Sequence, residues 1–188
     1  CYMKKAKILC VLPARLNSQR LPRKMLALIE GKPLLWHTWQ CAKKAKLPDE
    51  VIIATDSKEI CDVMEKLGAS VIMTSSKHQT GSDRVAEAAR KYKKFRPDII
   101  INIQGDEPLL DHRAVDAAAV LLLKDKEALV GTVLVPYKSE VDLNKPSIVK
   151  AVTDKNDFML YVSRAIIPYP RQPQPVNHYK KQLGIYIF

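Results

Sequence analysis

Short apolar runs alternate with segments of helical periodicity through most of the chain. The continuous apolar runs predict buried strands over residues 7–12, 50–55, 69–74, 98–104 and 128–135. Between these runs, apolar residues recur every three or four positions, which predicts helices over 33–46, after Asp56, after Ser82 and from Asp111 to about residue 124. A strand that is repeatedly followed by a helix indicates an α/β fold with a mainly parallel sheet and helices on both faces.

Helix-start and helix-stop residues refine these boundaries. Asp56 is the predicted N-cap of its helix, and Glu59 three residues later completes a capping-box pattern. Gly68 is the predicted end of the same helix, because glycine tolerates the left-handed conformation found there. Ser82 and Asp111 are the predicted N-caps of the next two helices, since short oxygen-bearing side chains accept hydrogen bonds from free helix amides.

The pattern changes after residue 136. Three shorter strands are predicted at 148–153, 158–163 and 182–188, and the proline-rich loop IPYPRQPQP lies between the last two. The last strand, QLGIYIF, carries the apolar pattern to the final residue with no polar tail. We therefore expect a single domain over residues 1–188 that is truncated at its C-terminus.

Composition narrows the class of protein. The chain is 47% hydrophobic and 27% charged, as in soluble globular proteins, and its longest apolar runs are too short to span a bilayer. Its four cysteines follow no metal-binding spacing, so we expect reduced thiols and a cytoplasmic protein.

The formal net charge of +11 indicates either a lysine-rich solvated surface or an anionic partner. Surfaces that bind nucleic acid interleave aromatic side chains with a basic stripe. Aromatic residues make up only 6% of this chain, and the lysines cluster on the predicted helix surfaces. The composition thus favours a small anion as the partner over nucleic acid or a membrane.

A basic loop with two prolines and no glycine, LPARLNSQRLPRKML, follows the first predicted strand. In open α/β sheets, ligands bind beyond the carboxyl ends of the strands. Arg15, Arg20, Arg23 and Lys24 offer charge-assisted hydrogen bonds to phosphate oxygens, and the prolines limit the freedom of the loop. The loop therefore suits a triphosphate, and a solvated basic turn is the alternative interpretation.

Two further strand-end segments carry candidate chemistry. Asp106, in QGDEP, follows the strand at 98–104, where a carboxylate can reach a Mg²⁺ ion held by phosphates. An N-cap role for Asp106 or Glu107 is the alternative. HQTGSDR, residues 78–84, runs into a helix start whose free amides suit an anion or a base edge, and an ordinary capped helix is the alternative. His78 is expected to be a solvated loop residue.

Taken in order, the motifs PARLNSQRLPRK, HQTGSDR, NIQGDEP, LYVSRAIIPY and QLGIY resemble those of the 3-deoxy-manno-octulosonate (Kdo) cytidylyltransferases over residues 7–188. Many sugar nucleotidyltransferases share the first motif, and its combination with QGDEP and SRAIIP is more specific. The resemblance implies a Rossmann-like nucleotidyltransferase fold and a homodimer. It also implies a Mg²⁺-dependent reaction of CTP with Kdo that gives CMP-Kdo and pyrophosphate for lipopolysaccharide biosynthesis.

The resemblance also implies roles for individual residues. Arg15, Lys24 and Asp106 are expected to be catalytic, with Asp106 as the metal ligand. The expected nucleotide-binding residues are Leu12, Ala14, Arg15, Ser18, Arg20, Lys24, Thr80, Gly81, Ser82 and Arg84, of which Leu12 and Ala14 act through their backbone. Gln104, Arg164 and Gln182 are expected to bind the sugar, Arg164 by pairing with its carboxylate.

Two positions depart from the family pattern. Arg23 stands where the family usually has glycine, whose φ freedom the turn could require. Gln182 stands where many relatives have histidine, so a sugar contact there is a neutral hydrogen bond. Family members also continue past this point, with a second metal-binding aspartate, further sugar contacts and much of the dimer interface.

Three alternatives stay open on the sequence alone. The first is a related enzyme for another acid sugar, such as an amino-Kdo or a nonulosonate. The second is a nucleotide-binding paralogue without catalysis, which the Arg23 departure and the expected truncation would fit. The third is a nucleic-acid-binding module, which the net charge fits but the acidic Asp106 and Glu107 do not.

Overall fold

The structure, a computed structural model, describes residues 5–16, 21–125, 127–172 and 174–188. It has two compact units: unit 1 comprises Cys1–Gly131 and Gly184–Phe188, and unit 2 comprises Thr132–Leu183. The elements in chain order are β1 (Ile8–Ala14), η1 (Lys24–Leu26), β2 (Leu28–Ile29), β3 (Lys32–Pro33), α1 (Leu34–Lys43), β4 (Glu50–Thr55), α2 (Lys58–Lys66), β5 (Ser70–Met73), α3 (Gly81–Lys91), β6 (Ile99–Ile103), α4 (His112–Lys124), β7 (Gly131–Pro136), α5 (Glu140–Leu143), β8 (Lys150–Thr153), β9 (Met159–Ser163), η2 (Val176–His178) and β10 (Lys180–Ile187).

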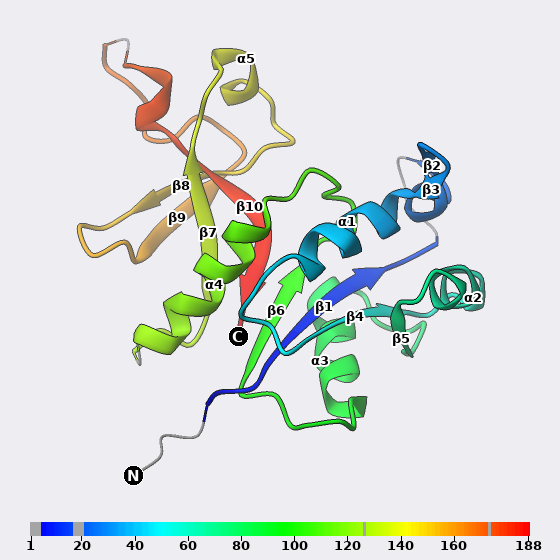
Figure 1. The fold of residues 1–188 in the computed structure, drawn as a ribbon. Coiled ribbons are helices and arrows are strands. Elements are labelled where there is room, and N and C mark those ends of the chain that lie inside the picture. The colour runs from blue at the N-terminus through cyan, green and yellow to red at the C-terminus, as the bar shows by residue number, and fades with distance from the viewer. Residues whose placement is uncertain (1–4, 17–20, 126, 173) are drawn as a thin grey trace. The chain divides into compact units, whose positions relative to one another are not determined.

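Unit 1 is built on a parallel sheet whose strand order is β5-β4-β1-β6 (Figure 1). The C-terminal part of β10 adds an antiparallel strand beside β6. At the centre of the sheet, Cys10 of β1 lies opposite Val51 of β4 and Ile101 of β6. Strands that are buried on both faces require continuous apolar runs, which is the pattern that predicted them. The predicted α/β fold with a mainly parallel sheet is confirmed.

Helices cover both faces of this sheet. Leu9 and Val11 of β1 share a core cluster with Val85 and Ala88 of α3 on one face. Helix α1 contacts β1 and β4 from the other face, where its Leu35 and Trp39 are buried (Figure 1). The three- and four-residue spacing of apolar positions in each helix thus matches the face that packs on the sheet.

Helix α2 starts one residue later than predicted. Its N-cap is Ser57, whose hydroxyl accepts a hydrogen bond from the Ile60 amide at 3.3 Å. The predicted N-cap role of Asp56, with Glu59 in a capping box, is therefore wrong. The predicted end of the helix is confirmed, because Gly68 follows the helix with a φ of +85°.

Helix α3 starts two residues earlier than predicted. Its N-cap is Thr80, whose hydroxyl accepts a hydrogen bond from the Asp83 amide at 3.2 Å, so the prediction of Ser82 is wrong. Asp111 caps α4 as predicted, by accepting a hydrogen bond from the Arg113 amide at 2.9 Å.

A buried arginine explains why Asp56 is not a cap. The Asp56 carboxylate accepts a hydrogen bond at 2.8 Å from Arg84, which is fully buried in α3. The same guanidinium donates to the Thr74 hydroxyl at 2.6 Å. Because Asp56 follows β4 and Thr74 follows β5, Arg84 ties the first turn of α3 to the ends of two strands.

Unit 2 holds β8 and β9, most of β7 and the N-terminal part of β10. Strand β8 pairs antiparallel with both β9 and β10, and β7 also pairs with β10. Tyr137, Leu143 and Tyr179 form its small core. Lys150, the first residue of β8, is only 1% exposed.

The structure also contains an unpredicted hairpin, β2–β3. Its turn places Glu30 and Gly31 at positive φ, 48° and 76°, as a two-residue type I′ turn requires. None of the helices in the described part of the chain has the length and hydropathy of a membrane span.

The substitution Asp56→Ala tests the contribution of the buried ion pair. It leaves the Arg84 guanidinium buried without its carboxylate. We expect the free energy of unfolding to fall by about 3 kcal/mol, the low end for a buried pair, because the Asp56 side chain is 20% exposed. Urea denaturation measures this loss. Asp62→Ala, which removes an exposed pair with Lys58, is the control and should cost little. Equal losses in the two variants would contradict the role given to Arg84.

Candidate active site

The carboxyl ends of the four parallel strands meet at one edge of the sheet in unit 1. The loop that follows β1 carries Arg15, and the loop that follows β6 carries Gln104 and Asp106. Pro13 connects these segments to the start of α3: a β-carbon at Gly81 would lie 3.5 Å from Pro13 Cγ, and one at Gly105 would lie 3.2 Å from the Pro13 carbonyl oxygen. The structure thus brings three of the predicted motifs together.

The loop after β1 offers its backbone and the side chain of Arg15. The side chains of Leu12 and Ala14 are buried, at 0% and 1% exposure, and the contact of their backbone with a nucleotide stays a prediction. Arg15 donates from Nη2 to the His78 carbonyl at 2.7 Å, which links this loop to the loop before α3. Ser18 and Arg20 lie outside the described residues.

An ion pair joins the loop after β1 to the loop after β6. Lys24 Nζ lies 2.6 Å from Asp106 Oδ2, and the two side chains are 31% and 29% exposed. The sequence predicted both residues as catalytic groups but not their contact with each other. The pair places a cation suited to phosphate beside a carboxylate suited to a metal.

The QGD turn is held tightly against the core. A β-carbon at Gly105 would lie 2.9 Å from Leu35 Cδ1 and 3.2 Å from the Pro13 carbonyl oxygen, so a larger residue there would require these neighbours to shift. The Gly105 carbonyl accepts a hydrogen bond from the buried Thr38 hydroxyl at 2.9 Å. Asp106 is therefore placed by α1. The alternative that Asp106 or Glu107 caps a helix is wrong, since α4 begins at His112.

The start of α3 contributes Thr80, Gly81 and Ser82. The Thr80 hydroxyl donates to the Asp83 carboxylate at 2.6 Å and accepts from the Asp83 amide, so it is engaged on both sides. Ser82 is exposed. Arg84, predicted to bind nucleotide, is buried, and its contact with a ligand stays a prediction.

His78 is anchored rather than solvated. Its Nε2 pairs with the Glu87 carboxylate on α3, and the two side chains are 20% and 18% exposed. Glu87 also bonds Lys91 and accepts from the Ser75 amide at 2.9 Å. These hydrogen bonds, from Lys91, the Ser75 amide and His78, lower the pKa of the Glu87 carboxyl to about 2. A charged Glu87 thus holds the loop whose carbonyl receives Arg15.

The three predicted sugar-binding residues fall in both units. Gln104 in unit 1 is exposed and packs beside Gly184, where a β-carbon would come within 3.1 Å of its side chain. Gln182 in unit 2 donates from Nε2 to the Thr132 hydroxyl at 3.1 Å. Arg164 in unit 2 is exposed and donates from Nη1 to the Pro146 carbonyl at 2.8 Å.

Arg23 adopts the conformation that glycine favours. Its φ of 59° and ψ of 20° lie in the left-handed region. The exposed guanidinium pairs with Glu59 of α2, and the Arg23 amide donates to the Leu16 carbonyl at 3.0 Å. The departure from the family glycine therefore keeps the turn, at a local cost in strain, and directs the side chain to α2.

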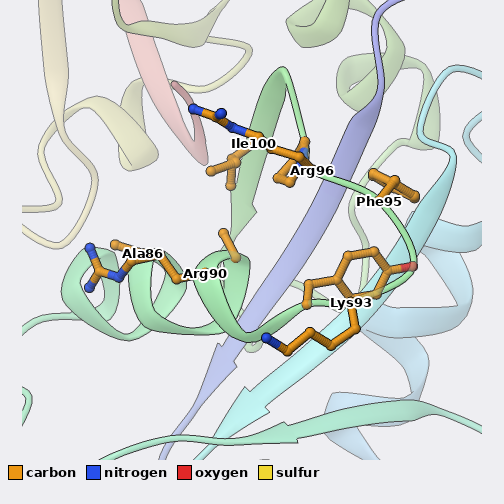
Figure 2. A pocket seen from close by; sticks show the side chains of 9 residues that line it. Ala86, Arg90, Lys93, Phe95, Arg96 and Ile100 are labelled. Carbon is orange, nitrogen blue, oxygen red and sulfur yellow. The ribbon is translucent and has the colours of Figure 1, made fainter.

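A separate cavity of about 570 Å³ lies at the other end of β6 (Figure 2). Its lining combines apolar residues, such as Phe95 and Ile100, with the basic residues Arg90, Lys93 and Arg96. The cavity is formed by α3 and the loop that leads into β6, so it is distinct from the strand-end residues described above.

Comparison with known proteins shows the family of the chain. A family model described as cytidylyltransferase matches residues 9–188. The chain belongs to the cytidylyltransferase family. Among curated cytidylyltransferases, the 3-deoxy-manno-octulosonate cytidylyltransferase of Francisella tularensis subsp. novicida is 43% identical, over 97% of this chain and 75% of the relative. That of Chloroherpeton thalassium is 40% identical, over 97% and 74%.

A solved structure of this cytidylyltransferase family has the same fold. CMP:2-keto-3-deoxy-manno-octonic acid synthetase in complex with CTP aligns with a TM-score of 0.87 at 36% identity, over 97% of this chain and 74% of that one. The resemblance predicted from the motifs is confirmed, and so is the nucleotidyltransferase fold.

The substitution Arg23→Gly tests the strain in this cytidylyltransferase turn. A non-glycine residue in the left-handed region lowers the free energy of unfolding by roughly 1 kcal/mol, and the exposed pair with Glu59 offsets little of this loss. We expect Arg23→Gly to leave the free energy of unfolding unchanged or to raise it by up to about 1 kcal/mol, measured by urea denaturation. Leu21→Gly, at a position without a positive φ, should lower stability. A clear loss in Arg23→Gly would mean that the Glu59 pair outweighs the strain.

Proposed function

We propose that this cytidylyltransferase joins CTP to Kdo, giving CMP-Kdo and pyrophosphate for lipopolysaccharide biosynthesis. The observation that carries the proposal is the Lys24–Asp106 pair, at 2.6 Å, on the edge of the sheet where α/β folds bind ligands. The relatives at 43% and 40% identity bear the name of this reaction. The matching solved structure contains CTP.

The reaction is a displacement at phosphorus. The anomeric hydroxyl oxygen of Kdo bonds to the α-phosphorus of CTP, and the bond from that phosphorus to the oxygen bridging to the β-phosphate breaks. The hydroxyl proton goes to solvent, and pyrophosphate leaves with the electron pair. Negative charge develops on the phosphate oxygens, so fixed cations beside them lower the barrier. Lys24 and Arg15 supply these cations, and the buried turn at Gly105 keeps the opposing loop in place.

The Asp106 carboxylate is suited to bind magnesium. One carboxylate oxygen accepts from Lys24, while its other oxygen has no hydrogen bond within the described part of the chain. Magnesium binds one or two carboxylates together with phosphate oxygens and water, a donor set that Asp106 and a triphosphate provide. When bound, Mg²⁺ supplies charge neutralisation at the phosphates. In the absence of ligands, Lys24 holds this carboxylate in place.

The start of α3 is the proposed site for the cytosine side of CTP. The first amides of a helix have no partner within the helix, and they bind anions or base edges. Gly81 has no side chain to cover these amides, and Ser82 presents an exposed hydroxyl. Arg84 holds the start of α3 in place through its hydrogen bonds to Asp56 and Thr74.

The sugar carboxylate is the proposed partner of Arg164. A guanidinium carries five N–H donors, and Arg164 uses one of them on Pro146. The remaining donors can form the two parallel hydrogen bonds that a carboxylate accepts. We further propose contacts from Gln104 and Gln182 to the sugar and a homodimer, as the family resemblance implies. We also propose a cytoplasmic location, as the cysteine pattern indicates.

Pyrophosphate release tests the proposed substrates. We expect release with Mg²⁺, Kdo and CTP, and none when UTP, ATP or GTP replaces CTP. Replacing Kdo with an amino-Kdo or a nonulosonate tests the alternative acceptors. Release that requires one of those sugars would transfer the proposal to that substrate. CTP-selective binding with no release for any acid sugar would indicate a binding paralogue.

The substitutions Lys24→Ala and Asp106→Asn test the assigned machinery. Each removes a charge next to the proposed reacting phosphates, so we expect turnover to fall by roughly a hundredfold or more. The melting temperature should change little because both side chains are partly exposed. Lys58→Ala and Asp62→Asn, from an exposed ion pair on α2, are matched controls that should keep normal turnover. Near-normal turnover in Lys24→Ala or Asp106→Asn would remove that residue from the mechanism.

A further inference from the structure

Unit 2 contains a buried lysine that the sequence did not single out. Lys150 begins β8 and is 1% exposed. Its ammonium donates three hydrogen bonds, to the carbonyls of Lys145 at 2.7 Å, Ile148 at 3.0 Å and Arg164 at 3.1 Å. An ammonium has three N–H donors, so Lys150 uses all of them on the backbone.

Lys150 has no counter-ion among the described residues of the chain. Burial lowers the pKa of its ammonium, and the nearby charge of Arg164 acts in the same direction. A buried charge that is bonded to neutral carbonyls gains less electrostatic free energy than one paired with a carboxylate, and its desolvation is costly. Stability alone is therefore a weak reason for this arrangement. What the three hydrogen bonds do provide is a fixed geometry for the backbone that they join.

The three carbonyls belong to two segments that are distant in sequence. Lys145 and Ile148 lie in the loop that follows α5, and Arg164 lies directly after β9. The Arg164 guanidinium donates to Pro146 in that same loop, at 2.8 Å. Arg164 is thus held at its backbone by Lys150, and its side chain rests on the loop that Lys150 also holds.

We infer that Lys150 is a positioning residue for the acid-sugar site, because its ammonium fixes both the Arg164 backbone and the loop on which the Arg164 guanidinium rests. This inference rests on the proposed function, in which Arg164 binds the carboxylate of Kdo. Lys150 itself is too buried to touch the sugar. Its effect is on where the guanidinium lies when the carboxylate arrives.

Steady-state kinetics of Lys150→Met with CTP, Mg²⁺ and Kdo test the inference. Methionine has a similar length but donates no hydrogen bond, so the Arg164 carbonyl and the loop lose their common anchor. We expect KM for Kdo to rise by roughly tenfold or more, the equivalent of one charge-assisted hydrogen bond, while KM for CTP stays unchanged. In an Arg164→Ala background, Lys150→Met should change KM for Kdo by less than about twofold, because the two residues act as one unit.

The matched control is Lys180→Met in the same unit. Lys180 also donates to two oxygens, of Thr153 and Asp157, but its side chain is 41% exposed and neither partner is Arg164 or the loop that Lys150 holds. Both KM values should stay normal in this variant. If Lys150→Met fails to fold, Lys150→Gln retains two donors, and a smaller rise in KM for Kdo is expected from it.

Two results would overturn the inference. A fall in kcat or melting temperature in Lys150→Met and Lys150→Gln, with KM for Kdo unchanged, would make Lys150 a structural residue only. Additive effects of Lys150→Met and Arg164→Ala on KM for Kdo would show that Lys150 does not act through Arg164. Failure of the proposed function gives a different result: the wild-type protein itself then releases no pyrophosphate with CTP and Kdo. That result would also rule out the inference about Lys150.

Discussion

The parallel pairing of β1 with β4 and β6 is the constraint on which the rest of unit 1 depends. Parallel strands point their carboxyl ends the same way, so the loops that leave β1 and β6 emerge side by side. This is why Lys24 and Asp106, far apart in sequence, form an ion pair. Lys24 and Asp106 are partly exposed, but the strands that position their loops are buried at all but one residue each. The apolar runs therefore determine the geometry of the polar site.

Two buried cations organise the polar parts of the two units. In unit 1, Arg84 meets a carboxylate and a hydroxyl and joins the start of α3 to β4 and β5. In unit 2, the partners of Lys150 among the described residues are backbone carbonyls, which it joins across two loops near Arg164. A planar guanidinium suits fixed side-chain partners, whereas a compact ammonium can gather carbonyls from several directions. Each cation acts through the segment that it holds.

The sequence predicted the elements well because their signals are local. Apolar runs and three- and four-residue spacing located the strands and helices of unit 1, and the family glycine at the position of Arg23 anticipated its left-handed φ. The errors arose where a distant partner decides. Asp56 was predicted to be an N-cap, but its carboxylate pairs with Arg84. His78 was predicted to be solvated, but it pairs with Glu87.

The features of the site that the sequence did not predict also depend on partners distant in sequence. Lys150 sits in the strand pattern IVKAVT, where a lysine among apolar residues is the only signal, and nothing nearby in sequence indicates three carbonyl partners. The contact between Lys24 and Asp106 likewise needs the strand order, which periodicity does not provide. Roles for the remaining site residues came from the family motifs, since no single spacing specifies a nucleotide.

Under the proposed function, each residue of the Lys24–Asp106 pair competes with the other residue's ligand: Asp106 competes with the phosphates for Lys24, and Lys24 competes with the metal for Asp106. A triphosphate that arrived alone would draw Lys24 away and leave a bare carboxylate beside a polyanion. A divalent cation that arrived alone would take Asp106 and leave an ammonium beside a second positive charge. Only when both arrive together is each half of the pair exchanged for a new partner of opposite charge. Metal and nucleotide binding are then thermodynamically linked, each strengthening the other by the same factor. The resting ion pair thus acts as a selectivity device for the metal–nucleotide complex.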